Sequence, residues 1–515
     1  MGSAGCQPAV CSRLPQTFDA ETWGRASFPF GELPNGAARQ PALPEILVSV
    51  AKTMDALSLR QIAEFGGAEL LRGNGETRIS RVSTDSRTIK PGQLFVALRG
   101  ENFDAHNFLE QVAKAGATGA MVSGNTPSTL PENFAILRAT DTLAAYQNFA
   151  ANYRKTLPLK VLGITGSNGK TSTKDFAASI LGRVFRVTKT EGNFNNHVGL
   201  PRTMLEANRD DQFAVWELGM NHPGEIAALA RIASADAAII TNIGIAHIEF
   251  MGSREAIARE KGALAEAIDP SGFVVLNADD EFSDSIAQRT RARVILAGIE
   301  KGAIRAIEVQ QTSGGCEFTI VEGAHRCRAQ LPVPGLHMVQ NAMLAVAAGR
   351  AFGVSLEECA AGLVSAPLTK ARLQIREING VQFIDDSYNA NPDSMKAALR
   401  TLMELDTDGK RVAVLGRMLE LGAESERGHR EVGETAATLG IDHLIAITDD
   451  TIADAAEKAG LQNSAVAKDA SEAAEMLSEI VGPGDLVLIK GSRSSRTELV
   501  LDEFAKLQPV GGNAQ

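Results

Sequence analysis

The sequence lacks the features typical of secreted, membrane-spanning or nucleic-acid-binding proteins. Its five cysteines are scattered without a Cys-x-x-Cys pair, which argues against a disulfide framework or a zinc site and favours a reducing compartment. No apolar run approaches the roughly 20 residues needed to cross a bilayer. The net charge of -11 provides no basic face for nucleic acid. We therefore expect a soluble, cytoplasmic protein with no membrane span and no nucleic-acid partner.

The length of the chain predicts about three domains. It has 515 residues, and a typical domain has roughly 150. The first segment contains Pro, Gly and Ala but no continuous apolar core, so it does not resemble a secretory signal. We interpret residues 1–53 as a disordered extension, with an ordered arm as the alternative. Met54 is then a candidate for the true start.

The rest of the chain predicts an α/β protein of three domains. Residues 54–157 have the pattern of a small α/β module, and the tripeptide from Leu157 to Leu159 ends it. Residues 158–367 predict a central domain with a mostly parallel sheet. Residues 368–515 predict a Rossmann-like, doubly wound sheet. The expected buried strands are 92–98, 159–165, 213–216, 237–240, 273–276, 381–384, 412–415, 444–447 and 486–489.

The strongest local signal is the glycine-rich segment Gly163–Thr171, which lies between an apolar run and an amphipathic helix. Glycines allow backbone N–H groups to surround phosphate oxygens, and the helix directs its N-terminus at the same anion. Lys170 would reach the β- and γ-phosphates, and the Thr171 hydroxyl would bind Mg2+. The segment is a variant, because Ile164 stands where the strict Walker pattern has glycine. It predicts a nucleotide site rather than an ordinary βα turn.

Two polar side chains follow predicted strands and are candidate metal ligands. Glu217 comes directly after residues 213–216, and His247 lies a few residues after 237–240. Ligands of open α/β sheets bind at the carboxyl ends of strands, so these two side chains and Thr171 are expected to converge there. Oxygen ligands suit Mg2+, although histidine is less typical. By contrast, Lys261 has the pattern of a solvated charge on a helix.

Several separate blocks together resemble the Mur ligase family, over about residues 54–510. The blocks are Thr84–Arg87, Gly166–Thr171, Gly192–Asn196, Glu217–Met220, Asn242–Glu249, Lys261–Gly262, Asp385–Pro392, Met418–Gly422 and Lys490–Arg493. One block alone would be weak, but their order and spacing make chance negligible. The blocks 385–392 and 418–422 resemble the branch of the family that adds a dipeptide.

The resemblance implies a role for each matching residue. Binding of ATP is implied for Gly166, Ser167, Asn168, Gly169, Lys170, Thr171, Asn341, Arg372 and Asp386. Contact with the other substrates is implied for Thr84, Asp85, Ser86, Arg87, Asn193, Asn195, Asn196, Tyr388, Asn389, Lys490 and Arg493. The implied metal ligands are Thr171, Glu217, His247 and Lys261, the last as a carbamate. The implied catalytic residues are Lys170, His247, Lys261 and Asn391.

Two positions depart from the family pattern. Met338 stands where asparagine is common, which puts one polar contact near the nucleotide in doubt. Arg417 stands where aspartate is usual, which affects either the interdomain contacts or the dipeptide pocket.

The resemblance implies a monomeric ligase that uses ATP and Mg2+. It would activate the carboxylate of UDP-N-acetylmuramoyl-tripeptide as an acyl phosphate and couple it to D-alanyl-D-alanine. The third residue of the tripeptide, lysine or a diamino acid, stays open. The alternatives are a sister Mur or folylpolyglutamate-type ligase that adds one amino acid, a phosphate-loop switch or kinase, and an inactive interaction protein. The last is disfavoured because Lys170, Thr171, Glu217, His247 and Lys261 are all present.

Overall fold

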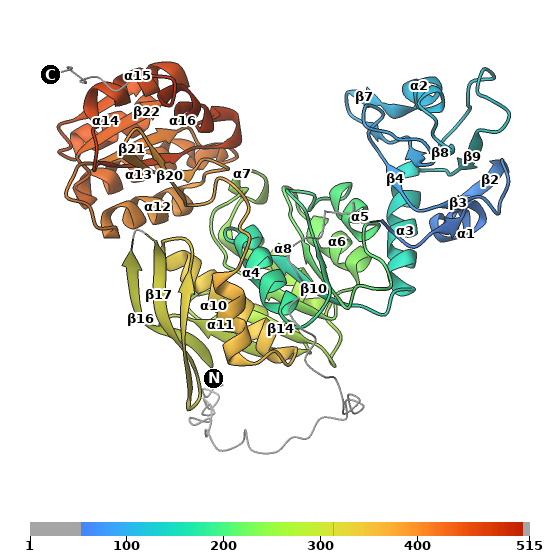
Figure 1. Ribbon diagram of the computed structural model, residues 1–515, viewed down its shortest axis with the longest axis horizontal. Coiled ribbons are helices and arrows are strands. Elements are labelled where there is room, and N and C mark those ends of the chain that lie inside the picture. The colour runs from blue at the N-terminus through green and yellow to red at the C-terminus, as the bar shows by residue number, and fades with distance from the viewer. Residues whose placement is uncertain (1–52, 313, 508–515) are drawn as a thin grey trace, which may run out of the picture. The chain divides into compact units, whose positions relative to one another are not determined.

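The computed structural model describes residues 53–312 and 314–507, which form an α/β protein with three main sheets (Figure 1). The prediction of a disordered extension concerns a segment that, apart from Thr53, lies outside the described residues. Within the described part of the chain, no helix is long and apolar enough to span a membrane. The fold class predicted from the sequence is confirmed.

The first sheet has five strands and belongs to the small amino-terminal module. In spatial order the strands are β2 (Glu69–Arg72), β9 (Ala135–Arg138), β8 (Gly119–Val122), β5 (Leu94–Val96) and β4 (Val82–Ser83). Only β2 is antiparallel to its neighbour. The helices are α1 (Leu59–Gly66), α2 (Leu109–Lys114) and α3 (Thr142–Lys155), and two short pairs are β1 (Leu57–Ser58) with β3 (Arg78–Ile79) and β6 (Arg99–Gly100) with β7 (Phe103–Asp104).

The second sheet has nine strands. In spatial order they are β11 (Val187–Lys189), β12 (Phe213–Glu217), β10 (Lys160–Thr165), β13 (Ala237–Ile240), β14 (Phe273–Asn277), β15 (Arg293–Gly298), β16 (Ile304–Thr312), β17 (Gly315–Glu322) and β18 (His325–Leu331). The strands from β11 to β16 are parallel, and β16 to β18 are antiparallel. The helices are α4 (Lys170–Gly182), α5 (Gly199–Met204), α6 (Glu225–Ala233), α7 (Ile248–Met251), α8 (Arg254–Glu266), α9 (Ser283–Ala287), α10 (Leu336–Ala351) and α11 (Leu356–Val364).

The third sheet has six strands and the alternation of a Rossmann-like fold. In spatial order they are β19 (Gln374–Ile378), β20 (Val381–Asp386), β24 (Leu486–Lys490), β21 (Arg411–Gly416), β22 (His443–Ile447) and β23 (Ser464–Ala467). Only β19 is antiparallel to its neighbour. The helices are α12 (Pro392–Glu404), α13 (Ser425–Leu439), α14 (Asp450–Lys458), α15 (Ala470–Ile480) and α16 (Glu498–Phe504).

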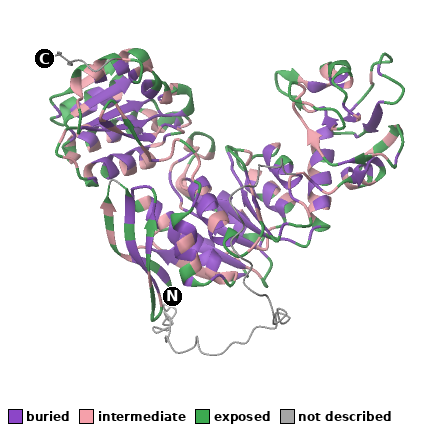
Figure 2. Cartoon of the chain, viewed as in Figure 1, coloured by how far each residue is buried: buried purple, intermediate pink, exposed green. Residues whose placement is uncertain are grey.

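The strands predicted from apolar runs are confirmed, because each run overlaps a strand whose residues are mostly buried (Figure 2). The run 92–98 is longer than its strand, since β5 covers only Leu94–Val96. The antiparallel extension β16–β18 was not predicted. Strands β16 and β18 largely alternate buried and exposed residues, whereas β17 is mostly buried. Charged and polar residues interrupt all three, so they lack the continuous apolar runs that marked the predicted strands.

The order of the central strands determines which segments meet at the site. Strand β10 lies between β12 and β13, with Ile164 beside Glu217 and Thr165 beside Ile240. Because these strands are parallel, the segments that follow them emerge at one edge of the sheet. The glycine-rich loop, Glu217 and the segment 241–247 therefore meet there.

Helix α4, which begins at this loop, packs closely against α11. A Cβ atom on Gly362 would lie 2.7 Å from the Cα atom of Ile180, too close for the two backbones to remain in place. We therefore expect Gly362→Ala to lower the free energy of unfolding by about 1–3 kcal/mol, measured by urea denaturation.

Gly182→Ala is the matched control. Gly182 is the last residue of α4, and a Cβ atom added there would meet nothing within 4 Å. It should leave stability unchanged or raise it by about 0.4–1 kcal/mol. Equal effects of the two substitutions would contradict the close packing of α4 on α11.

Candidate active site

A cavity of about 940 Å3 lies at the carboxyl edge of the central sheet. Its lining comes from the glycine-rich loop, from the segments after β12 and β13, and from the third sheet region. Of the residues predicted for the site, it is lined by Ser167, Asn168, Gly169, Lys170, Thr171, Asn193, Asn195, Asn196, Glu217, His247, Asn341, Arg372, Asp386, Tyr388, Asn389, Asn391, Lys490 and Arg493. The sequence thus identified side chains that the fold gathers from distant segments.

The glycine-rich loop requires its glycines for close approach. Gly166 has φ of 149°, and a Cβ atom there would lie 1.8 Å from the Thr241 hydroxyl oxygen. Gly169 has φ of 79°, and a Cβ atom there would lie 2.2 Å from the Asn341 side-chain oxygen. The Asn168 N–H donates to the side chain of Asn242 at 2.9 Å. The loop is therefore held in a turned conformation that leaves its helix N-terminus facing the cavity.

Lys170 begins helix α4, and its ammonium group is bound by the loop itself. Nζ donates to the carbonyl oxygens of Gly166 at 2.8 Å and Ser167 at 3.1 Å. Burial lowers the pKa of Lys170, with Arg372 lowering it further and Glu217 opposing the change. A half-buried cation bound only by carbonyl oxygens is suited to exchange them for phosphate oxygens.

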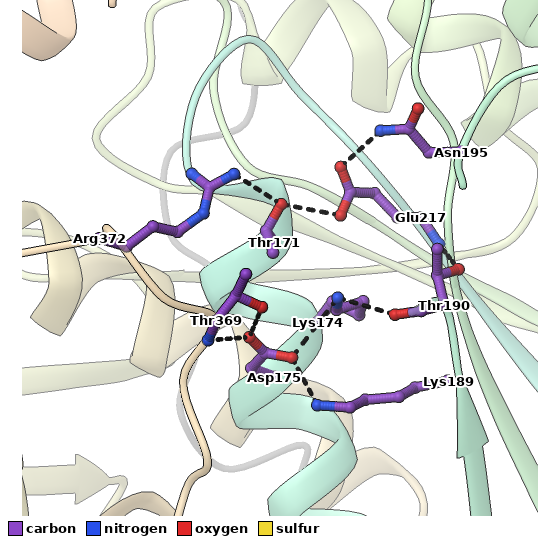
Figure 3. A network of polar contacts seen from close by, with 9 residues as sticks. All are labelled: Thr171, Lys174, Asp175, Lys189, Thr190, Asn195, Glu217, Thr369 and Arg372. Atoms are coloured by element: carbon purple, nitrogen blue, oxygen red, sulfur yellow. Dashed lines mark hydrogen bonds and ion pairs between the residues drawn. The ribbon is translucent and has the colours of Figure 1, made fainter. Parts of the chain in front are cut away.

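Thr171 joins three parts of the site (Figure 3). Its hydroxyl donates to Oε2 of Glu217 at 2.9 Å and accepts from Nη2 of Arg372 at 3.0 Å. The other oxygen of Glu217 accepts from the Asn195 side chain at 2.8 Å. Glu217 is only 2% exposed. The predicted convergence of Thr171 and Glu217 at the strand ends is therefore what the fold produces.

Arg372 lies in the segment between α11 and β19 and enters the same cavity. Its guanidinium carbon lies 4.4 Å from the ring centroid of Tyr388. Its buried Nε has no hydrogen-bond partner among the described residues. A buried, unpartnered donor beside Thr171 fits an anionic group that binds in the cavity.

His247 is oriented by a carboxylate from the third sheet region. Its Nδ1 lies 2.5 Å from Oε2 of Glu420. Burial lowers the pKa of His247, and Lys170 adds to this while Glu420 opposes it. The imidazole is therefore neutral near pH 7, and Nδ1 is engaged, so a metal ion would bind through Nε2.

Lys261 corrects one interpretation of the sequence. The helical pattern suggested a solvated charge, but Lys261 in α8 is only 1% exposed. Burial, together with the positive charge of Lys170, holds the pKa of Lys261 well below its usual value. This environment favours the neutral, nucleophilic amine over the ammonium ion. Lys261 and Gly166 are not among the residues that line the cavity.

The third sheet region contributes two further contacts. The Asn391 amide donates to the Asn168 side-chain oxygen at 2.6 Å, while its own oxygen caps helix α12. Lys490 donates to Asp386 at 2.6 Å, and both side chains are largely buried. Family resemblance had put Lys490 and Asp386 near different substrates, whereas the fold pairs them directly. A substrate near one therefore experiences the charge of both.

The predicted residues Thr84, Asp85, Ser86 and Arg87 are not among those that line this cavity. They follow β4 in the amino-terminal module. The Arg87 guanidinium donates two hydrogen bonds to the Asp85 carboxylate, of 2.9 and 2.8 Å, and these lower the pKa of Asp85 to about 2. Their predicted role would therefore involve a separate part of an extended substrate.

The two departures from the family pattern occupy different surroundings. Met338 is buried and lines the cavity. Its neighbour His337 also lines it, and burial lowers the pKa of His337 to about 4. The side chain of Arg417 is exposed, and its carbonyl oxygen accepts a hydrogen bond from the Ser492 N–H.

The donors at the cavity fit Mg2+ bound together with phosphates. Within residues 53–312 and 314–507, no cluster of three or more His, Cys, Asp or Glu side chains is arranged to hold a metal alone. Mg2+ commonly takes only one or two carboxylates and completes its shell with water and phosphate oxygens. The Thr171 hydroxyl and the Glu217 carboxylate, 2.9 Å apart, are donors of this kind.

Sequence reasoning missed several residues that shape the site. Glu420 lies within the block Met418–Gly422, but no pattern indicated that it would contact His247 across more than 170 residues. Asp393 likewise makes a contact between distant segments, because its carboxylate accepts from the Ile245 N–H at 3.1 Å. Thr190 accepts from the Glu217 N–H at 3.0 Å and so fixes the backbone that carries this carboxylate. Contacts between distant segments have no local sequence signal.

Comparison with known proteins defines the class to which this fold and site belong. Three family models match along the chain: "Mur ligase family, catalytic domain" at residues 78–154, "Mur ligase middle domain" at 164–349, and "Mur ligase, glutamate ligase domain" at 371–493. The chain belongs to the Mur ligase family.

Three relatives show how far the similarity to individual proteins extends. The UDP-N-acetylmuramoyl-tripeptide–D-alanyl-D-alanine ligase of Bacillus subtilis is 38% identical over 455 residues, covering 87% of this chain and 98% of the relative. A crystal structure of MurF from Acinetobacter baumannii is 34% identical, with a TM-score of 0.82, covering 88% of this chain and all of the other. MurF of Thermotoga maritima, solved in complex with ADP, is 27% identical with a TM-score of 0.74, covering 83% and 97%.

Proposed function

We propose that this protein ligates D-alanyl-D-alanine to UDP-N-acetylmuramoyl-tripeptide at the expense of ATP, forming the pentapeptide precursor of peptidoglycan. The observation that carries the proposal is the identity of 38% across nearly the whole length of a relative with this name. The cavity supports it, because phosphate-binding groups and groups from the third sheet region line the same space. We propose that the chain acts as a cytoplasmic monomer.

The reaction has two chemical steps. A carboxylate oxygen of the tripeptide attacks the γ-phosphorus of ATP, and ADP leaves. The amine of the dipeptide then attacks the carbonyl carbon of the acyl phosphate, loses a proton, and phosphate leaves. Both reactants of the first step are anions, so the site must neutralise charge as they approach.

Specific residues would meet this requirement. Lys170 would exchange its carbonyl partners for ATP phosphate oxygens, and Arg372 would use its unpartnered Nε for the same phosphates. Asn341 and Asp386 would contact the adenosine. In the proposed division of labour, residues 54–157 bind the uridine end, 158–367 bind ATP, and 368–515 bring the dipeptide.

Magnesium would be held by Thr171, Glu217 and His247, with Lys261 as an additional ligand once it is a carbamate. When bound, Mg2+ would withdraw charge from the phosphate oxygens. Glu420 would keep His247 oriented, and Asn195 would keep Glu217 oriented.

The proposal predicts dipeptide-dependent phosphate release. With ATP, Mg2+ and UDP-N-acetylmuramoyl-tripeptide, addition of D-alanyl-D-alanine should start steady phosphate release and give the pentapeptide product, detected by mass. L-alanyl-L-alanine is the matched control and should not support release. Phosphate release that ignores the dipeptide would indicate a phosphate-loop switch, and release supported by a single amino acid would indicate a sister ligase.

The burial of Lys261 and its lowered pKa predict a carbamate. The neutral form of the amine adds to CO2 and releases a proton, which gives an anionic oxygen ligand in place of the amine. We expect incubation with 13C-bicarbonate to give a carbamate resonance in the 13C NMR spectrum of the wild-type protein. The resonance should be absent in Lys261→Ala. The control is Lys155→Ala, because Lys155 lies on the exposed end of α3; this variant should keep the resonance. An identical spectrum for wild type and Lys261→Ala would contradict the assignment.

A further inference from the structure

A buried ion-pair network lies on helix α4, one turn beyond the phosphate loop (Figure 3). Asp175 is fully buried, and Lys174 is only 1% exposed. One carboxylate oxygen of Asp175 accepts from Nζ of Lys189 at 2.6 Å and lies 3.5 Å from Nζ of Lys174. Burial alone would raise the pKa of Asp175, but the two lysines hold it below its usual value. The carboxylate is therefore ionised.

The second oxygen of Asp175 reaches a different part of the chain. It accepts hydrogen bonds from both the backbone N–H of Thr369, at 2.9 Å, and the Thr369 hydroxyl, at 2.7 Å. Thr369 lies in the connection between α11 and β19, three residues before Arg372. Both oxygens of the buried Asp175 carboxylate therefore have partners. One oxygen contacts the two lysines of the central sheet region, and the other accepts from Thr369 at the junction with the third sheet region.

The junction needs an external constraint. Residues 366–373 have no regular secondary structure. Ala371 has φ of 59° and Leu373 has φ of 53°, so the two residues beside Arg372 are in the left-handed region that side chains disfavour. Such a conformation persists only where surrounding contacts hold it, and the paired bonds from Asp175 to Thr369 are buried contacts of this kind.

The same network also reaches Glu217, the buried carboxylate of the site. Lys174 donates to the carbonyl oxygen of Thr190 at 2.8 Å, and the Thr190 hydroxyl accepts from the Glu217 N–H at 3.0 Å. Two adjacent residues of α4 therefore connect this helix to the site. Lys174 reaches Glu217 through Thr190, and Asp175 reaches the segment of Arg372 through Thr369. Thr171, on the preceding turn of that helix, is bonded to both.

We propose that Asp175 is a positioning residue. Through Thr369, Asp175 fixes the junction so that Arg372 faces the phosphate loop. Nucleotide binding therefore depends on Asp175, although Asp175 is not among the residues that line the cavity. The inference deepens the proposed function, since it concerns how the ATP site of that ligase is completed. A binding measurement tests it without any ligation.

The test uses Thr369→Val in the full chain. Asp175→Asn would leave the buried Lys174 and the half-buried Lys189 without their counter-charge and threatens the fold. Thr369→Val removes one hydroxyl at nearly constant shape. We expect it to weaken binding of the non-hydrolysable analogue AMP-PNP with Mg2+ roughly ten-fold by calorimetry, because a hydrogen bond to a buried charge is lost. Tryptic cleavage after the exposed Lys370 should become faster.

Three controls separate positioning from general destabilisation. Thr369→Ser restores the hydroxyl and should bind within roughly two-fold of wild type. Ser179→Ala removes a hydroxyl of helix α4 that bonds the Gly362 carbonyl at 2.7 Å and lies 3.4 Å from the Ser365 hydroxyl. It leaves the bonds between Asp175 and Thr369 in place and should bind the analogue like wild type. In an Arg372→Ala background, Thr369→Val should add less than roughly two-fold, because its effect passes through Arg372.

Two results would overturn the proposal. One is wild-type affinity of Thr369→Val for the analogue. The other is a full ten-fold loss from Thr369→Val even when Arg372 is absent, which would assign the effect to stability. Neither result depends on whether the chain ligates the dipeptide. If ligation failed while the analogue data behaved as expected, only the proposed function would be wrong.

Discussion

The hydroxyl group of Thr171 is the contact on which the arrangement of the site depends. It follows the phosphate loop directly, donates to Glu217 and accepts from Arg372. These three residues come from a helix N-terminus, the end of a parallel strand and the junction before the third sheet region. A single small side chain can join them because the parallel sheet brings its strand ends to one edge.

Charge balance is the second constraint. The overall charge of -11 gives no general attraction for anionic substrates. The cations at the cavity are instead individually placed: Lys170 on loop carbonyls, Arg372 on Tyr388 and Lys490 on Asp386. Lys170 and Arg372 are half-buried, and Lys490 is almost fully buried in its ion pair with Asp386. Local preorganisation of this kind costs less at the moment of reaction than gathering mobile charges.

Much of the fold was predictable from local signals. Continuous apolar runs identified many of the parallel strands, and the glycine spacing before Lys170 and Thr171 predicted a turned loop that leads into a helix. Strands β16–β18 were missed because charged and polar residues interrupt their apolar residues, and β16 and β18 alternate buried and exposed positions. Lys261 was misinterpreted for a related reason, since a charged residue on a helix gives no sign of its burial in the fold.

The long-range contacts were beyond local reasoning. Glu420 meets His247, and Asp175 meets Thr369, across more than 170 residues in each case. Such pairs are fixed by how whole sheets pack, and neither spacing nor periodicity encodes them. Family resemblance supplied site residues such as Lys490 and Asp386, but it did not predict that the two would pair.

The central claim is that the tripeptide carboxylate itself attacks ATP to form an acyl phosphate. Oxygen transfer tests this most directly. UDP-N-acetylmuramoyl-tripeptide labelled with 18O in its reacting carboxylate would be ligated to D-alanyl-D-alanine, and the released phosphate analysed by mass. The account predicts one 18O atom in each phosphate, because the carboxylate oxygen leaves with phosphorus. Unlabelled phosphate would show that phosphoryl transfer goes to water, and would contradict the account.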